Sequence, residues 1–184
     1  MAQLIKTIEA DWEKVILRYP TLSDCRKLQK FINQGIRESL QGGGYLGRTN
    51  MTSLKDEREW LKDVVKKIKA RRTVYIMAEY KNRVVGAADV RREPDGATEH
   101  IGNFGIVILE EFTGKGLGTK MIGTILDLAK KILKVEIVQL SVYENNKRAQ
   151  GLYKKMGFRE MGRIKKGRKI KGVYKDNILM VKYL

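Results

Sequence analysis

A glycine-rich turn between a strand-like segment and a helical one limits the folds that this chain can adopt. The turn consists of Gly114, Lys115, Gly116, Leu117, Gly118 and Thr119. At such a junction, exposed backbone N–H groups and the positive end of the helix dipole bind phosphate oxygens. Glycine lets the backbone approach these oxygens closely, and Lys115 and Lys120 add positive charge. The turn is therefore predicted to bind an anion.

The spacing of the turn excludes two common nucleotide-binding motifs. A Walker loop has four intervening residues between its first glycine and a Gly-Lys pair that is followed by Ser or Thr, and this segment lacks that order. The dinucleotide fingerprint needs a glycine three residues after its second glycine, where this chain has Met121. The turn is therefore not a P-loop, and a Rossmann turn is disfavoured.

The segments around the turn indicate a mixed α/β (α+β) chain. Helical periodicity follows the capping residues near Thr21 and runs through Ile32, and Ser53 caps a second helical pattern that reaches Ile68. From Arg72 the apolar pattern becomes that of strands, and Lys81-Asn82 marks a hairpin turn. Strands are expected over 15–18, 74–78, 84–90, 101–109, 136–142, 158–164 and 173–181, and two further helices over about 116–131 and 146–156.

Glycines predict irregular structure at two places. Gly102 and Gly105 interrupt the strand expected over 101–109, which indicates a β-bulge or a close backbone approach. Three glycines, residues 42–44, lie between the first two helical patterns. This segment is either a plain connecting loop or a gate over a substrate.

Nothing in the sequence marks a boundary between domains. The chain has no internal repeat and only two prolines, so residues 1–184 are expected to form one domain with residues 1–12 as an N-terminal extension. No apolar run approaches the roughly 18 to 20 residues that cross a bilayer, and the N-terminus lacks a secretion signal. We therefore expect a cytoplasmic protein that does not enter a membrane.

The composition restricts the chemistry and the partners. Cys25 and His100 are the single cysteine and the single histidine, so an intrachain disulfide is impossible and no metal site is expected. The formal net charge of +17 attracts polyanions, including nucleic acid and nucleotide cofactors. The charge names no particular partner, because most of it is explained by solvated helix faces.

A second motif follows the glycine turn and runs through a strand, a loop, a helix and a turn between Leu140 and Phe158. Its key residues are Asn146, Ala149, Leu152, Tyr153, Gly157 and Phe158. Together with the glycine turn, in this order, the motif resembles the GNAT superfamily of acyl-CoA-dependent N-acetyltransferases. The resemblance covers about Val15 to the C-terminus and is strongest from Ile101 to Phe158.

The resemblance implies a central, mixed, mostly antiparallel sheet that is flanked by helices and splayed at the acetyl-CoA site. The splay would lie between the strand ending at Leu109 and the strand ending at Val142. The resemblance implies that pantetheine pairs with the backbone of Ile106, Val107 and Ile108. It implies that the pyrophosphate binds the turn from Gly114 to Thr119, that Asn146 touches the cofactor and that Tyr153 is the general acid for the CoA thiolate.

The sequence departs from the family at three positions. Thr113 stands where the family commonly has Arg or Gln, Asn103 stands where many members have a glutamate base, and Ser141 stands where some protein N-terminal acetylases keep another glutamate. The candidates that remain for the base are Glu99, His100 and Glu144. Each would act through an ordered water, unless the amine arrives already neutral.

The function implied by the resemblance is acetyl transfer from acetyl-CoA to a primary amine, by direct attack in a ternary complex. The amine belongs to a small molecule, an amino acid or a protein, and the positive charge disfavours polyamines. The alternative is a non-catalytic protein of this fold that binds nucleic acid through its basic surface, although no known DNA-binding motif is present. Open sheet edges make a homodimer reasonable.

Overall fold

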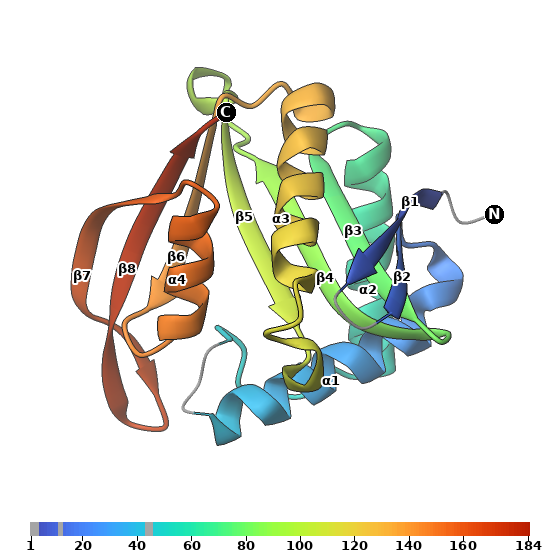
Figure 1. Ribbon diagram of the computed structural model, residues 1–184, viewed down its shortest axis with the longest axis horizontal. Coiled ribbons are helices and arrows are strands. Elements are labelled where there is room, and N and C mark those ends of the chain that lie inside the picture. Colours follow the sequence, from blue (N-terminus) through green and yellow to red (C-terminus); the bar gives the residue numbers. More distant parts are fainter. Residues whose placement is uncertain (1–3, 11–12, 43–45) are drawn as a thin grey trace.

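The computed structural model describes residues 4–10, 13–42 and 46–184, and these residues form an open eight-stranded sheet with helices on both faces (Figure 1). The strands are β1 (Leu4–Ala10), β2 (Glu13–Arg18), β3 (Thr73–Tyr80), β4 (Arg83–Arg92), β5 (Ile101–Ile108), β6 (Ile137–Tyr143), β7 (Arg159–Ile170) and β8 (Val173–Tyr183). The helices are α1 (Cys25–Gln41), α2 (Leu54–Lys69), α3 (Leu117–Leu128) and α4 (Lys147–Lys155). The predicted mixed α/β class and helix-flanked sheet are confirmed.

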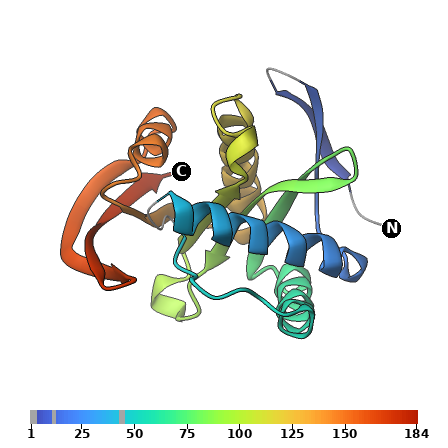
Figure 2. The same ribbon diagram turned by 90° about the horizontal axis from the view of Figure 1, so that it is seen from below.

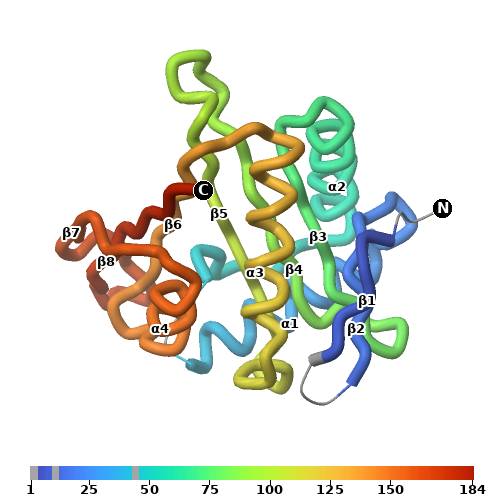
Figure 3. Tube along the Cα trace, turned by 45° about the horizontal axis from the view of Figure 1, so that its top comes forward, coloured from blue at the N-terminus to red at the C-terminus, as the bar shows by residue number. Residues whose placement is uncertain are grey.

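The strands lie in the order β1-β2-β3-β4-β5-β6-β8-β7. All neighbouring pairs are antiparallel except β5 and β6, which are parallel. The β5–β6 pairing is confined to Ile101–Asn103 and Ile137–Gln139, after which the two strands part. Figure 3 shows β6, β8 and β7 turning away from β5 beyond this short pairing.

Each face of the sheet is covered by its own pair of helices (Figure 2). On one face, Trp60 of α2 packs edge-on against Tyr75 of β3, with ring centroids 5.5 Å apart. On the opposite face, Tyr153 of α4 contacts Phe104 of β5 in the same edge-on way. Because strand side chains alternate between faces, successive residues of β4 and β5 point to different pairs of helices.

The N-terminal segment belongs to the sheet. Strand β1, which lies within the expected extension of residues 1–12, pairs antiparallel with β2, and the Ile8 side chain is buried. Several other elements also run beyond the predicted ranges. The helix after the glycine turn continues as a π-helical turn over Ala129–Leu133, and β7 extends to Ile170 because it pairs with β8 along most of its length.

Two local predictions are confirmed. The Ser53 side chain caps α2 by accepting a hydrogen bond from the Asp56 amide. Lys81 and Asn82 form the β3–β4 turn, and both have positive φ, as the tightest hairpin turns require. Among the described residues, no helix combines the length and the apolar character needed to cross a bilayer.

Candidate functional site

A wedge opens between β5 and β6 where their pairing ends. A cavity of about 460 Å³ lies there, and its walls include Phe104, Leu140 and Ser141. At the closed end of the wedge, Gln139 donates a hydrogen bond of 3.1 Å to Asn103. The rings of Phe104, Tyr153 and Phe158, with centroids 6.0 Å apart, pack together on the α4 side. The splayed sheet implied by the resemblance is therefore present.

The backbone of Ile106, Val107 and Ile108 forms one wall of the wedge. These residues pair with Ala88, Ala87 and Gly86 of β4, whereas their other edge has no pairing with β6. In an antiparallel strand, alternate N–H and C=O groups point away from the single neighbour. The free edge of β5 therefore suits an extended amide-bearing ligand such as the expected pantetheine.

The glycine turn has the geometry that its sequence predicted. Gly114 and Gly116 both have φ of +74°, in the left-handed region that favours glycine, and Gly116 is the N-cap of α3. No side chain caps this helix, so the first backbone N–H groups stay available for an anion. Leu117 is fully buried and anchors the turn, and Gly118 and Thr119 continue the first helical turn.

A cationic side chain that the sequence motifs do not indicate, Arg148 of α4, lies beside this turn. Arg148 donates a hydrogen bond to the Thr113 hydroxyl, and that hydroxyl in turn donates to the Glu110 carbonyl. Thr113 occupies the position where the resemblance expects Arg or Gln. Arg148 therefore brings a guanidinium beside the turn from another helix, a placement that depends on how α3 and α4 pack.

The two asparagines after β6 fit a ligand in the wedge. Asn146 caps α4 through its side-chain oxygen, which accepts a hydrogen bond of 3.1 Å from the Ala149 amide. The neighbouring Asn145 has a buried side-chain oxygen with no hydrogen-bond partner among the described residues. Since a buried polar atom without a partner is costly, Asn145 suits a donor such as a ligand amide. The residues present thus fit the expected CoA group.

Tyr153 projects from α4 into the aromatic cluster at the wedge. Burial raises the pKa of its hydroxyl to about 12, so the hydroxyl keeps its proton at neutral pH. No described residue hydrogen-bonds to this hydroxyl, so the proton remains available to a ligand. The placement suits a proton donor.

None of the three base candidates forms a hydrogen bond with Tyr153 among the described residues. Glu99 forms ion pairs with Arg72 and Arg92, and it precedes β5 at the closed end of the wedge. The His100 carbonyl accepts hydrogen bonds from the first residues leading into β6, also at the closed end. Glu144 follows β6, and its carboxylate accepts a hydrogen bond from the Asp176 amide. The geometry favours none of them as the base.

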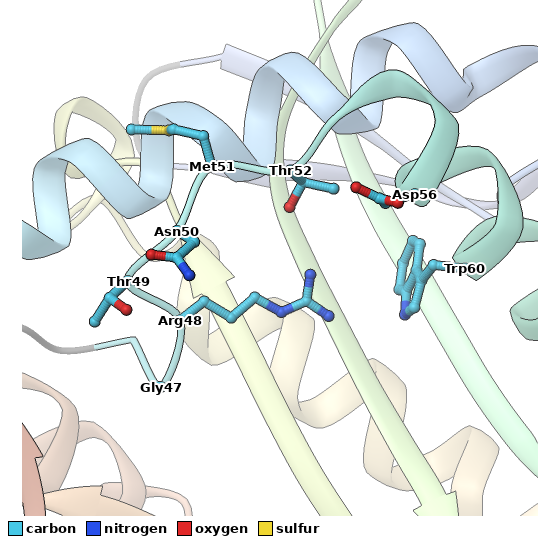
Figure 4. A pocket seen from close by; sticks show the side chains of 8 residues that line it. All are labelled: Gly47, Arg48, Thr49, Asn50, Met51, Thr52, Asp56 and Trp60. Carbon is cyan, nitrogen blue, oxygen red and sulfur yellow. The ribbon is translucent and has the colours of Figure 1, made fainter.

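A second cavity of about 480 Å³ lies on the α1–α2 face. It is lined by the segment 47–52 and by Asp56 and Trp60 of α2. The Arg48 side chain extends across this cavity toward Trp60 (Figure 4).

Charged groups lie beneath this cavity, where α2 meets the sheet. Glu57 is almost fully buried, and burial raises the pKa of its carboxyl to about 7, although Arg48 opposes the shift. Burial, Asp89, and Glu57 together hold the pKa of Tyr75 well above its usual range. The sequence carries a signal for Glu57, because it falls on the apolar face of α2 with Leu61 and Val64.

The arrangement of the described side chains does not indicate a metal site. Within residues 4–10, 13–42 and 46–184, no group of three or more His, Cys, Asp or Glu side chains could hold a metal ion.

Comparisons with known proteins agree with the wedge. The model of the acetyltransferase (GNAT) family matches residues 39–158. The uncharacterized N-acetyltransferase YokL, derived from the SPbeta prophage of Bacillus subtilis (strain 168), is 30% identical over 128 residues, which are 68% of each chain. The L-amino acid N-acetyltransferase AaaT of Escherichia coli (strain K12) is 28% identical over 94 residues, 51% of this chain and 57% of AaaT.

Solved structures share the fold. A GNAT acetyltransferase from Streptococcus pneumoniae superposes with a TM-score of 0.82 at 22% identity, covering 92% of this chain and 99% of the other. The microcin C7 self-immunity acetyltransferase MccE, solved with acetyl-CoA and AMP, gives a TM-score of 0.74 at 17% identity, covering 92% of both chains.

Proposed function

Since this chain belongs to the GNAT acetyltransferase family, as the family match over residues 39–158 shows, we propose that it transfers an acetyl group from acetyl-CoA to a primary amine by direct attack. Acetyl-CoA supplies the activated acetyl thioester. Relatives named N-acetyltransferases support the same activity. They give no support to the non-catalytic, nucleic-acid-binding alternative.

One observation carries the proposal for this chain: the unpaired edge of β5, the glycine turn and Tyr153 border the same wedge. The edge of Ile106–Ile108 binds pantetheine, and the amides from Gly116 to Thr119 with Lys115 and Arg148 hold the pyrophosphate. Asn145 and Asn146 contact the pantetheine arm. Tyr153 donates its proton to the departing thiolate.

The acceptor enters from the α1–α2 face, where the second cavity lies. Arg48 extends across this cavity, and the ionisable carboxyl groups of Glu57 and Asp89 lie beneath it. This arrangement suits a small amine that also carries a carboxylate better than a polyamine, whose several positive charges would meet Arg48 and a chain of +17.

Calorimetric titration with acetyl-CoA, followed by a screen of amines, tests the proposal. The screen pairs each amino acid with its amide, and it includes spermidine and short peptides. We expect one-to-one binding of acetyl-CoA and faster release of free CoA thiol with amino acids than with their amides. Absence of acetyl-CoA binding would refute the function, and equal rates for acids and amides would refute the acceptor class.

We also propose that the protein is cytoplasmic and forms a homodimer. Strands β1 and β7 lie at the two edges of the sheet and present unpaired backbone groups, which support self-association. Light scattering on the purified protein gives the mass that distinguishes a dimer from a monomer.

A further inference from the structure

Asp89 is a partly buried carboxylate at the centre of the sheet that none of the sequence motifs includes. It lies on β4 between Tyr75 of β3 and Gly105 of β5, its cross-strand neighbours. Because directly paired strand residues share a face, Asp89 points to the α1–α2 side, where Trp60 covers Tyr75. Its side chain is 17% exposed. Asp89 thus faces the acceptor side of the sheet.

The two carboxylate oxygens of Asp89 have different surroundings. Oδ2 accepts a hydrogen bond from the Arg91 guanidinium, whereas no described residue donates to Oδ1. Oδ1 lies over β5, so close that a Cβ at position 105 would be 2.9 Å from it. A Cβ this close would displace the carboxylate, so Gly105 leaves the room that Oδ1 occupies. The β4–β5 pairing is regular at Gly105, without a bulge, and the group that approaches its backbone is this side-chain oxygen.

Gly105 lies beside the part of the wedge where the reacting acetyl group is expected. Pairing between β5 and β6 ends at Asn103, and the free edge expected to bind pantetheine begins at Ile106. Phe104 and Gly105 are successive residues and therefore face opposite sides of the sheet. On the α4 side, Phe104 contacts Tyr153. On the α1–α2 side, the Asp89 Oδ1 atom lies next to Gly105. A proton donor and a proton acceptor thus flank the same peptide unit.

We propose that Asp89 is the catalytic base, which accepts through Oδ1 a proton from the acceptor ammonium on the α1–α2 face. The inference rests on the proposed function. An N–H bond of the ammonium breaks as the O–H bond forms, and the freed nitrogen electron pair forms a C–N bond with the acetyl carbonyl carbon. The C–S bond then breaks, the thiolate takes the Tyr153 proton, and the still positively charged nitrogen releases its second proton to solvent. Solvent removes the proton from Asp89 and restores the one on Tyr153.

The charges around Asp89 leave it ionised at neutral pH. Burial raises the pKa of its carboxyl to about 6, and the Arg91 guanidinium opposes this shift. Tyr75 of β3, Glu57 of α2 and Arg48 of the preceding segment are further ionisable groups on this face, and β5 contributes uncharged Gly105 opposite. Asp89 is therefore a carboxylate above about pH 6 that is more basic than an exposed one.

The test compares the wild-type protein with Asp89→Asn, which keeps the shape and removes the base. With the best amine from the screen, we expect kcat to fall by about 100-fold or more, with acetyl-CoA affinity unchanged in calorimetry. The acidic limb of the wild-type kcat/KM profile near pH 6 should disappear. Asp63→Asn is the matched control, since Asp63 is an exposed partner of Lys67 on α2 and should leave kinetics unchanged.

Two further measurements separate a base from a merely structural residue. In Asp89→Asn, the rate of acetylation of a β-fluorinated analogue of the same amine should fall less than about tenfold. This analogue is largely neutral at about pH 8 and therefore needs no base. Gly105→Ala, which pushes the carboxylate aside, should lower kcat with the parent amine while keeping Asp89.

The outcomes distinguish this inference from the proposed function. If Asp89→Asn retains the wild-type rate and the acidic limb, or loses activity equally with both amines, Asp89 is not the base and the acetyltransferase function stands. If the folded wild-type protein acetylates no amine of the screen, the proposed function fails and the base role falls with it.

Discussion

Leu152 of α4 lies so close to Gly118 of α3 that a Cβ at position 118 would be 2.8 Å from Leu152 Cδ2. The contact joins the helix that begins at the glycine turn to the helix that carries Tyr153. Ile108 of β5 also lies within 3.4 Å of the same point. The spacing of the two helices at the wedge thus depends on the absence of a side chain at position 118.

Two glycines of α3 are expected to respond oppositely to alanine. Gly118→Ala should lower the free energy of unfolding by about 1–3 kcal/mol through overpacking against Leu152, and it should weaken acetyl-CoA binding. Gly123→Ala should raise it by about 0.5–1 kcal/mol, because nothing lies within 4 Å of its Cβ and alanine favours helix. Urea unfolding measures both, and equal changes would contradict the packing.

Negative charge in the glycine turn should abolish cofactor binding. Gly116→Asp introduces a side chain at φ of +74° and a carboxylate where phosphate oxygens are expected. We expect acetyl-CoA binding to become undetectable in calorimetry. Gly172→Asp is the matched control, because Gly172 is also left-handed, with φ of +82°, but lies in the β7–β8 turn. A folded Gly116→Asp protein that binds normally would remove the turn from the phosphate site.

Loss of the Tyr153 hydroxyl should affect turnover and leave binding intact. Tyr153→Phe keeps the ring packing against Phe104 and Phe158 and removes only the proton donor. We expect kcat to fall by about 100-fold, with acetyl-CoA affinity and thermal stability near the wild-type values. Stopped-flow measurement of thiol release checks the step, and an unchanged kcat would exclude the acid role.

Glu57 should make the protein less stable as the pH rises. Its folded pKa is raised from 4.5 to about 7, so between these values the folded state holds a proton that the unfolded state has lost. Stability from this group is therefore full below pH 4.5 and is lost as the pH rises to 7. Glu57→Gln should recover at most about 3 kcal/mol at pH 8, at 1.36 kcal/mol per pKa unit.

Urea unfolding at pH 5 and pH 8 measures the effect. Glu59→Gln, an exposed change on the same helix, should leave the difference between the two pH values unchanged. If the wild-type protein and Glu57→Gln show the same pH dependence, the Glu57 carboxyl is not desolvated in solution.

The contacts of the Arg148 and Glu99 side chains could not be predicted from the sequence. The sequence assigns Arg148 no role, yet its guanidinium donates a hydrogen bond to Thr113 of the glycine turn. Glu99 was a base candidate by its position before β5, yet it is held by Arg72 and Arg92. Both placements depend on which elements pack side by side, and that information is not local.

The order of the helices and of the strands from β2 onward, the glycine turn and the Tyr153 motif could be determined from the sequence by itself. Each depends on a few consecutive residues: φ above zero needs Gly114 and Gly116, and apolar periodicity distinguishes helix from strand. The splay of β5 from β6 was available only through resemblance. The partnership of Asp89 with Gly105 was decided by tertiary structure, because strand register and face bring together residues that are distant in the chain.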